Sequence, residues 1–388
     1  MSTNVQHPRA LPTAIAARGD VESALAARIF PEPPHPYRTP FARDGSRVLH
    51  TRAFRRLAGK TQVFTRLPGD ALSDHLRSRL THTLEVAQIS RTLAAAMGLN
   101  AELAETLALV HDIGHPPFGH AGEKALHHAL QQHGLSFDHN LHALRIVTWF
   151  EARYASFRGL NLTLGVREGI VKHSHDYSAA QHPELAEYFL DQFPPLEAQL
   201  IDLTDEIAYL TSDLDDGLGA DILPLEQVRA GVPLFRGFHD EVLAAYPAAS
   251  GKITANEAIK RMVDAFATSL MEETGARVAV LGATSLEEIR RAPRRLAALG
   301  AEMEAARAET KKFLYNNLYN APAQLEPHRH AAQVVSELFA ALIAEPGQLP
   351  ADHQAEIATQ GLARTVADYI AGMTDNYVEQ AWLRCGGR

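Results

Sequence analysis

The sequence predicts an all-α fold, and three observations support this prediction. Apolar residues recur every three or four positions over long stretches, which is the spacing of one face of a helix. Prolines and glycines stand at the ends of these stretches, where helices begin and end. Alternating strand patterns are scarce, and LNLTLGV (160–166) is the best strand candidate.

The first forty residues, with PEPPHP and TP, are typical of an N-terminal arm that is partly flexible. Asp138 is positioned as the N-cap of a helix, and the helix from residue 194 opens with proline and closes with glycine. In chain order, we expect helices over residues 79–98, 101–112, 138–154, 194–218, 253–275, 285–319 and 351–384.

Composition limits the class of protein. The chain has 388 residues, of which 46% are hydrophobic, and its net charge of -9 does not indicate nucleic-acid binding. Cys385 is the single cysteine, which excludes an intrachain disulfide framework and fits a reducing cytosol. The N-terminus lacks the apolar core of a signal peptide, and no run approaches the roughly 18 apolar residues of a membrane span. We therefore expect a cytoplasmic protein with no membrane partner.

Histidine is unusually frequent, with 20 residues, eight of them between His111 and His142. His111 and Asp112 are adjacent at the end of a helical stretch, so both can reach one point only beyond the helix end. Gly114 and the prolines that follow it end the helix there. Imidazole and carboxylate suit a divalent ion such as Mn, Fe, Co, Zn or Mg. The alternative is an Asp cap beside an incidental histidine.

Further metal ligands are available at a distance in the sequence. His82 lies in the first turn of the 79–98 helix. Asp205, Tyr209 and Asp213 recur every fourth residue and form one stripe on the 194–218 helix; the alternative is a solvated acidic face. Two imidazoles and two carboxylates around one metal would leave positions open for water and substrate.

A basic run extends from Arg43 to Arg79, with nine basic residues against three acidic ones. This local excess in an acidic chain indicates an anionic ligand, because arginine suits phosphate oxygens. The alternative for any single arginine is a solvated helix face. The basic residues are Arg43, Arg47, Arg52, Arg55, Arg56, Lys60, Arg66, Arg77 and Arg79.

His120 and Glu123 are three residues apart at a helix start, so the carboxylate can orient the imidazole as in a general acid or base. The alternative is a capping or packing histidine. His115 and His139 can add donors for a phosphate. We expect the remaining histidines of this part of the chain to lie on the surface: His127, His128, His133, His173, His175 and His182. No serine lies in a nucleophile elbow, and no P-loop is present.

Several blocks resemble the deoxyguanosinetriphosphate triphosphohydrolase-like family of HD-domain metal-dependent phosphohydrolases. They begin near residue 35 and continue to the C-terminus, and their common order is highly specific. The blocks are HTRAFRRLAGKTQVF (50–64), RSRLTHTLEVAQISR (77–91), HDIGHPPFGHAGE (111–123), FDHN (137–140), DEIAYLTSDLDD (205–216) and DYIAGMTDNYV (368–378).

The resemblance implies an HD-domain helical bundle with additional C-terminal helices. Its expected parts are an arm over 1–40, a phosphohydrolase core over 41–217 and a C-terminal helical region over 218–388. It also implies a single-metal site. The ligands would be His82, His111, Asp112 and Asp205.

The same resemblance implies roles in substrate binding and chemistry. His120 would act at the scissile α-phosphate, with Glu123 orienting it. The other matching positions are Arg79 for phosphate, His115 and His139 for phosphate contact or proton relay, Gln62 and Asp213 for the sugar 3′-hydroxyl, and Tyr209 beneath the deoxyribose. The chain departs from many relatives at Asn376, where they carry arginine, so base preference stays open.

These features predict a metal-dependent dNTP triphosphohydrolase, with one Mn, Mg, Fe or Co ion, that releases deoxynucleoside and inorganic triphosphate. One alternative is an HD-type nucleotidase or phosphodiesterase acting on other nucleotides, and a second is a nucleotide-binding regulatory protein. The resemblance also implies a homo-oligomer and a second dNTP as allosteric effector.

Overall fold

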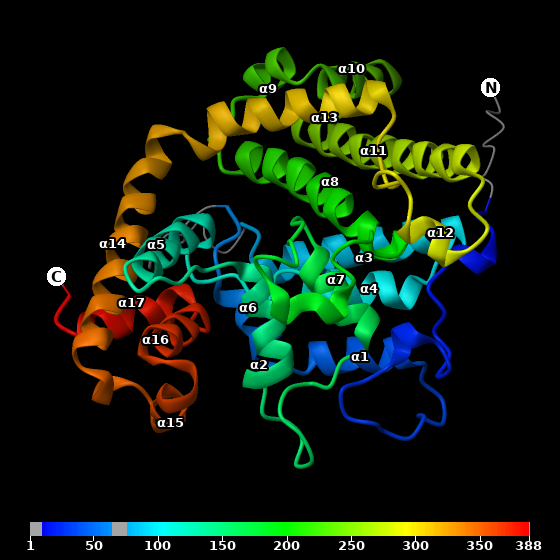
Figure 1. Ribbon diagram of the computed structural model, residues 1–388. Helices are drawn as coiled ribbons and strands as arrows, with labels where there is room; N and C mark the ends of the chain where they lie inside the picture. Colours follow the sequence, from blue (N-terminus) through cyan, green and yellow to red (C-terminus); the bar gives the residue numbers. More distant parts are fainter. Residues whose placement is uncertain (1–9, 64–75, 388) are drawn as a thin grey trace. The chain divides into compact units, whose positions relative to one another are not determined.

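The computed structural model describes residues 10–63 and 76–387. Within these ranges the regular structure is helical and no strand is present, which confirms the all-α prediction (Figure 1). The start of the predicted N-terminal arm and Arg66 of the basic run lie outside the described residues.

The chain divides into two units, each made of segments that are distant in sequence. Unit 1 comprises the described part of Met1–Ser46 with Leu84–Leu109 and Leu162–Leu318. Unit 2 comprises the described parts of Arg47–Thr83, Val110–Asn161 and Tyr319–Arg388. The predicted limits 1–40, 41–217 and 218–388 stay a prediction.

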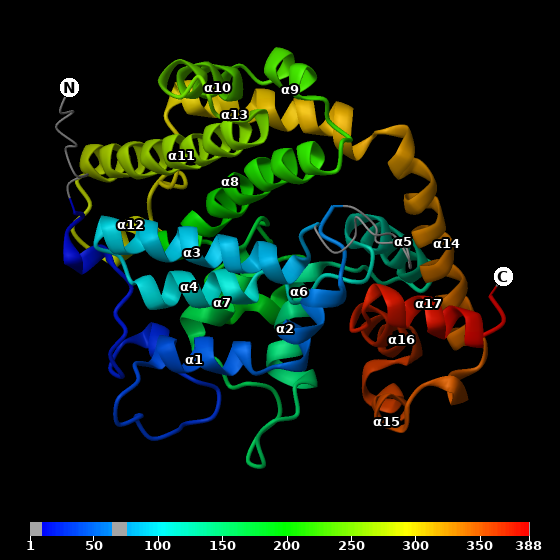
Figure 2. The same ribbon diagram turned by 180° about the vertical axis from the view of Figure 1, so that it is seen from behind.

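In unit 1, α8, α11 and α13 lie side by side (Figures 1 and 2). Gly169 lets α7 approach α4, because a Cβ atom there would lie 2.2 Å from Leu107 Cδ2. The α-helices of unit 1, three of which have one end in unit 2, are α1 (Pro40–Leu49), α3 (Arg79–Met97), α4 (Ala101–Val110), α7 (Leu164–Lys172), α8 (Leu196–Gly219), α9 (Leu225–Gly231), α10 (Pro233–Ala245), α11 (Gly251–Leu281), α12 (Leu286–Arg290) and α13 (Ala301–Leu314).

In unit 2, α5 packs against α14, which also contacts α16 and α17 (Figure 1). The core between these helices is apolar and includes Phe118, Leu126, Val334, Ile370 and Trp382. The α-helices of unit 2 are α2 (Arg52–Arg56), α5 (Gly119–Gln131), α6 (His139–Arg145), α14 (Pro322–Ala344), α15 (Ala351–Gln360), α16 (Leu362–Ala371) and α17 (Asp375–Arg384).

Short helical turns complete the secondary structure of residues 10–63 and 76–387. The 3-10 turns are η1 (Thr13–Ile15), η2 (Ala24–Ala26), η3 (Leu57–Gly59), η6 (Pro183–Tyr188) and η8 (Pro346–Gln348), and the π-helical turns are η5 (Ile146–Phe150) and η7 (Tyr315–Tyr319).

The strand candidate LNLTLGV (160–166) is wrong. Thr163 forms only an isolated bridge with Arg28, its N–H donates to Asp44 Oδ2 at 2.7 Å, and α7 begins at the next residue. Leu160 and Leu162 are buried. A short apolar run does not distinguish a buried strand from a buried lead-in to a helix.

Three predicted helix limits were also wrong. The helix expected over 285–319 is interrupted, because α12 ends at Arg290, α13 begins only at Ala301 and the chain continues into η7 at Tyr315. The helix expected over 351–384 is three helices, because Gly361 has a φ of 79° and Thr374 caps a new helix. The helix that starts after Asp138 has the predicted N-cap, with the Asp138 side chain accepting from Leu141 N at 3.0 Å. It leaves α geometry at Ile146, where η5 begins.

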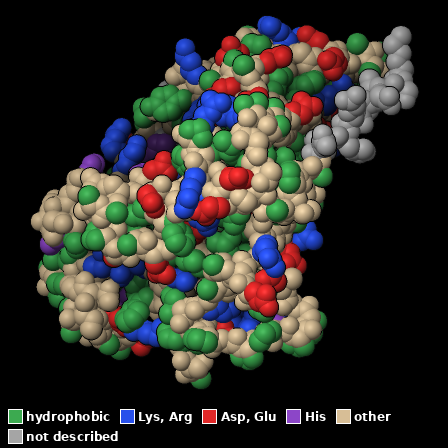
Figure 3. Space-filling view, turned by 45° about the vertical axis from the view of Figure 1, so that its right-hand side comes forward, with side chains coloured by type: hydrophobic (Ala, Val, Ile, Leu, Met, Phe, Trp, Pro, Cys, Tyr) green, Lys and Arg blue, Asp and Glu red, His purple; other side chains and the backbone are tan. Residues whose placement is uncertain are grey.

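Basic and acidic side chains are interspersed over the face of the molecule in Figure 3. Among the described helices, none combines the length and the apolar composition needed to cross a bilayer.

Candidate active site

The adjacent residues His111 and Asp112, the HD pair, lie in a tight turn, which we call the HD turn. The chain leaves α4 at Val110, and His111 and Asp112 follow at once, each 3% exposed. Gly114 approaches the start of α6 so closely that a Cβ atom would lie 1.9 Å from the His139 carbonyl oxygen. Since no side chain fits at position 114, the turn can pack directly on the residues that begin α6.

Three of the four predicted metal ligands meet in unit 2. His82, buried in the first turn of α3, has its ring centroid 5.9 Å from that of His111. Asp112 Oδ1 lies 3.5 Å from His111 Nε2. Asp205, the fourth, is half-buried on α8 in unit 1, and its role as a ligand stays a prediction.

The chemistry of Asp112 fits a bound cation. Its Oδ2 atom is buried and has no hydrogen-bond partner among residues 10–63 and 76–387, and a buried carboxylate oxygen is costly without a partner. Burial opposes ionisation, but His111, Arg79 and His115 outweigh it and hold the pKa of Asp112 well below its usual range. An ionised carboxylate beside two imidazoles is a donor set for a divalent transition metal.

Arg79 and His115 border the same carboxylate. Arg79 Nη1 lies 3.0 Å from Asp112 Oδ1, and His115 Nδ1 lies 3.0 Å from the same atom. Both side chains are buried. Burial, followed by Arg79 and His139, holds the pKa of His115 well below its usual range, so the ring is neutral.

A cluster of three histidines and one glutamate continues from this turn into α5 and α6. Donor atoms of His115, His120 and Glu123 all lie within 4.8 Å of one another. The rings of His115 and His139 stack with centroids 4.0 Å apart. His120, with its side chain 78% exposed, is the accessible member.

Glu123 lies between two imidazoles. Its Oε1 is 2.8 Å from His139 Nδ1, and its Oε2 is 3.5 Å from His120 Nδ1. Although burial opposes ionisation, the bonds to His120 and His139 hold the pKa of Glu123 far below its usual range. Burial lowers the pKa of His139, but Glu123 outweighs it and raises that pKa overall. The cluster therefore combines a neutral, a protonatable and an exposed imidazole.

The predicted stripe on α8 in unit 1 is formed. Asp213 is 2% exposed, which contradicts a solvated acidic face at this position. The Tyr209 hydroxyl donates to Glu206 at 2.9 Å, and Glu206 also accepts from Arg307 at 2.5 Å and from Lys311 at 2.8 Å. These contacts fix the position of the Tyr209 ring. Sequence reasoning missed Glu206, Arg307 and Lys311 as neighbours of Tyr209. The two cations lie on α13, which is distant from α8 in the sequence.

Most of the basic run serves the fold. Arg47 donates to the carbonyl oxygens of Leu160 and Asn161, and Arg56 donates to that of Gly372. Arg79 is the member that borders Asp112. Gln62, predicted to bind the sugar, is half-buried, and its Oε1 has no hydrogen-bond partner among the described residues.

Two buried residues of unit 2, Lys60 of the basic run and Asp375, have contacts that sequence reasoning missed. Lys60 donates to the carbonyl oxygens of His115 and Ala371, and Asp375 accepts from Thr61 and Phe118. Both residues lie inside the family-like blocks, but no local spacing connects them to the histidine cluster.

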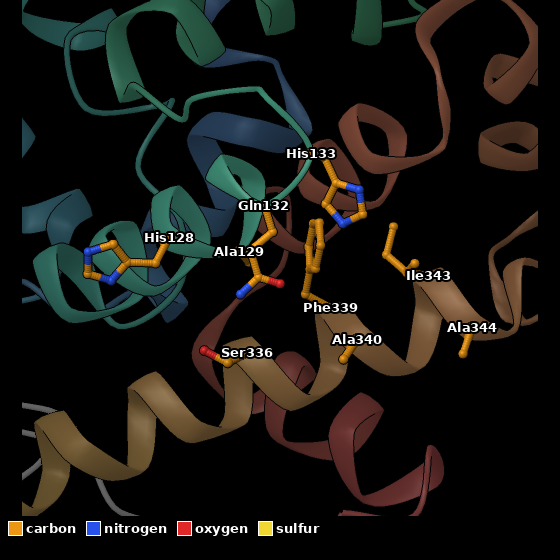
Figure 4. Close-up of a pocket in the computed structure, with 9 residues that line it drawn as sticks. All are labelled: His128, Ala129, Gln132, His133, Ser336, Phe339, Ala340, Ile343 and Ala344. Atoms are coloured by element: carbon orange, nitrogen blue, oxygen red, sulfur yellow. The ribbon is translucent and has the colours of Figure 1, made fainter.

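The prediction of surface histidines is wrong for one of the six. His173 is buried, and its Nδ1 lies 2.7 Å from Asp202 Oδ1. His128 and His133 are exposed and border a groove of about 460 Å³ between α5 and α14. In Figure 4 the Phe339 ring stands beside His133, with centroids 5.7 Å apart. None of the predicted site residues lines this groove.

Two known protein families match the chain. The HD domain matches residues 79–210, and the phosphohydrolase-associated domain matches residues 297–384. A deoxyguanosinetriphosphate triphosphohydrolase-like protein of Ralstonia pickettii (strain 12J) is 43% identical over 351 residues, covering 90% of this chain and 89% of the relative. The chain belongs to the deoxyguanosinetriphosphate triphosphohydrolase-like family.

Other relatives agree. The deoxyguanosinetriphosphate triphosphohydrolase-like protein of Azoarcus sp. (strain BH72) is 43% identical, covering 92% of each chain. That of Thiobacillus denitrificans (strain ATCC 25259 / T1) is 42% identical, covering 92% of this chain and 93% of the relative. The HD match begins at Arg79 and includes the histidine cluster. The protein is therefore an HD-domain phosphohydrolase with groups suited to a divalent metal.

Proposed function

We propose that this phosphohydrolase is a metal-dependent dNTP triphosphohydrolase. The reaction joins a water oxygen to the α-phosphorus and breaks the bond from that phosphorus to the sugar 5′-oxygen. Deoxynucleoside and inorganic triphosphate leave. The observation that carries the proposal is the cluster of His115, His120, Glu123 and His139 beside the HD turn, because hydrolysis at the α-phosphorus needs proton transfer there.

The metal ligands in this proposal are His82, His111, Asp112 and Asp205. They would hold one divalent ion (Mn, Mg, Fe or Co), which when bound supplies Lewis-acid polarisation of the α-phosphate. Support comes from the buried Asp112 Oδ2 atom and from the proximity of His82 and His111. Asp205 is included among the ligands because its position in the sequence, after His82, His111 and Asp112, matches the order of the ligands in the family.

The other residues neutralise charge and move protons. Arg79, buried beside Asp112, directs a guanidinium at the phosphate. His120, exposed at the start of α5, transfers a proton while the water oxygen bonds to the α-phosphorus and the sugar 5′-oxygen leaves. Glu123 orients the His120 imidazole. The neutral ring of His115 and the protonatable ring of His139 contact phosphate oxygens or relay the proton.

Recognition of the sugar uses Gln62, Tyr209 and Asp213 in this proposal. The Gln62 amide and the Asp213 carboxylate hold the 3′-hydroxyl, and Tyr209 packs beneath the ring where a 2′-hydroxyl would not fit. Glu206 supports this, because it fixes the Tyr209 hydroxyl. Buried polar groups matched to one sugar discriminate strongly against another.

Product analysis tests this function. The purified chain is incubated with a dNTP and Mn or Mg, and the products are separated by ion-exchange chromatography. We expect deoxynucleoside and triphosphate in equal amounts. Release of phosphate or pyrophosphate, or turnover of monophosphates or cyclic nucleotides alone, would favour the nucleotidase or phosphodiesterase alternative. Binding of nucleotide without turnover would favour a regulatory protein.

A further inference from the structure

Asp375, the first residue of α17, is buried and accepts three hydrogen bonds within unit 2. Oδ2 accepts from Thr61 N at 2.8 Å and from Thr61 Oγ1 at 2.5 Å, and Oδ1 accepts from Phe118 N at 2.9 Å. Capping of α17 does not require Asp375, because the Thr374 side chain accepts from Tyr377 N. Its carboxylate instead joins two distant parts of the chain.

The first part is the segment that leads to Gln62. Thr61 forms a bridge with Ser78, and Arg79 N donates to Lys60 O at 3.3 Å. The bonds from Asp375 to Thr61 therefore act on the segment that pairs with the start of α3. That start carries Arg79 and His82.

The second part is the turn that leads to His120. Phe118 has a φ of 62°, a left-handed conformation that is unfavourable for a residue with a side chain. Among the described residues no side chain caps the start of α5, and the N–H of Phe118 donates to Asp375 from outside the helix. At Gly119, which precedes His120, a Cβ atom would lie 3.2 Å from Arg79 Nη2.

Lys60 connects the same segments a second time. Lys60 is 3% exposed, and its Nζ donates to His115 O and, at 2.9 Å, to Ala371 O. Ala371 is the last residue of α16, four residues before Asp375. The junction of α16 and α17 thus contacts residues 60–61 and the turn 115–118 through the buried side chains of Lys60 and Asp375.

We propose that Asp375 is a positioning residue, which with Lys60 fixes the segments that carry Gln62, Arg79 and His120 in the geometry needed for hydrolysis. The inference rests on the proposed function and extends it to the C-terminal part of the chain. Asp375 lies in the region that matches the phosphohydrolase-associated domain (297–384), so in this proposal that region stabilises the turn that begins α5. In this proposal Asp375 acts through Thr61 and Phe118 and not on the substrate.

The test is Asp375→Asn in the full chain. The amide has one acceptor oxygen, so its NH2 group must face an N–H or O–H donor of Thr61 or Phe118. We expect kcat to fall about 10- to 100-fold, because small misplacements of catalytic groups cost that much, with a smaller change in KM and unchanged metal content. The matched control is Asp352→Asn, an exposed aspartate in the first turn of α15, which should retain wild-type kcat.

A second pair of variants grades the effect. Thr61→Val removes the hydroxyl bond to Asp375 and keeps the backbone bond, so we expect a smaller loss of kcat than in Asp375→Asn. Thr61→Ser keeps the hydroxyl and should restore most of the activity. Equal activity of the two variants would contradict the proposal.

Hydrogen exchange separates this proposal from the proposed function, because it needs no substrate. In Asp375→Asn, peptides covering Thr61 and Phe118 should exchange faster than in wild type, whereas peptides of α11 should not change. Normal exchange with normal kcat would overturn the positioning role. If Asp375→Asn has a lower melting temperature but a normal kcat at temperatures well below that melting temperature, the role of Asp375 is purely structural. Faster exchange in Asp375→Asn, together with no release of triphosphate by the wild-type chain, would sink only the proposed function.

Discussion

His139 Nδ1 lies 2.8 Å from Glu123 Oε1, closer than the 3.5 Å between His120 Nδ1 and Glu123 Oε2. The carboxylate therefore has two imidazole partners, and the buried one is the nearer. The i to i+3 spacing of His120 and Glu123 indicated only the first partner. Because Glu123 raises the pKa of His139, its charge favours the protonated form of that ring, in addition to its predicted role in orienting His120.

Replacing Glu123 with Gln should reduce kcat and move the pH profile. If His139 must be protonated, activity is lost as the pH rises through its raised pKa. Glu123→Gln removes the largest influences that raise this pKa. Burial still lowers it and only the smaller effects of Asp138 and Asp112 still raise it, so the basic limb should move to lower pH. We expect kcat to fall by about 10²- to 10⁴-fold, measured over pH 5–9. The control is Glu326→Gln, an exposed glutamate on α14. An unchanged basic limb would contradict this reading.

Removing the His120 imidazole should abolish turnover and leave metal binding intact. His120→Ala removes the proton-transfer group, with an expected loss of about 10²- to 10⁴-fold in kcat. His128→Ala removes an exposed histidine of the same helix and should retain activity. Metal content by mass spectrometry accompanies the kinetics, and activity retained in His120→Ala would refute its role.

In contrast to His120→Ala, a substitution in the HD turn should reduce metal binding. His111→Ala should lose bound metal and activity together, because the imidazole is one of four predicted ligands and its removal leaves an incomplete set for a transition metal. The purified variant is loaded with Mn, dialysed and analysed for metal beside His128→Ala. Full occupancy in His111→Ala would remove this residue from the ligand set.

Unit 2 should lose stability in acid through a buried pair. Asp368 Oδ1 lies 3.2 Å from His142 Nδ1, and Arg145 Nη2 lies 2.5 Å from Asp368 Oδ2. Burial lowers the pKa of His142 below 6.5, so the unfolded chain binds the proton first and stability falls as the pH drops below that value. The pKa of Asp368 is lowered by His142 and Arg145 against burial, which adds a further loss below its ordinary pKa of 3.8.

Urea unfolding at pH 7 and pH 5 measures this effect. The free energy of unfolding should decrease between the two values in wild type and decrease less in His142→Gln, with His128→Gln as the exposed control. Asp368→Asn should lose about 1–3 kcal/mol at pH 7, because a buried group is left without its charged partner. An identical decrease in wild type and His142→Gln would contradict the assignment.

Substrate range and regulation are tested together. The four dNTPs are assayed singly and in mixtures with Mn, Mg, Co and Fe, beside light scattering for the oligomeric state. A homo-oligomer with a second dNTP as effector predicts that mixtures support turnover that single nucleotides do not. Equal rates with single nucleotides and mixtures would exclude an activating site, and the single-nucleotide rates measure base preference.

The sequence by itself determined the local features of this protein. Apolar periodicity predicted the helices, Asp138 was recognisable as an N-cap, and Gly114 with the prolines marked the end of the helix before the HD pair. These signals act between residues a few positions apart, where the geometry of the helix sets the neighbours.

Only the tertiary structure decided the contacts made across the chain. Asp375 is 257 residues from Phe118 and 314 from Thr61, and Glu123 has its nearer partner 16 residues away on another helix. A left-handed residue such as Phe118 is also invisible in the sequence, because its conformation is held by these distant bonds. The path of the folded chain, and not the spacing of residues, brings such groups together.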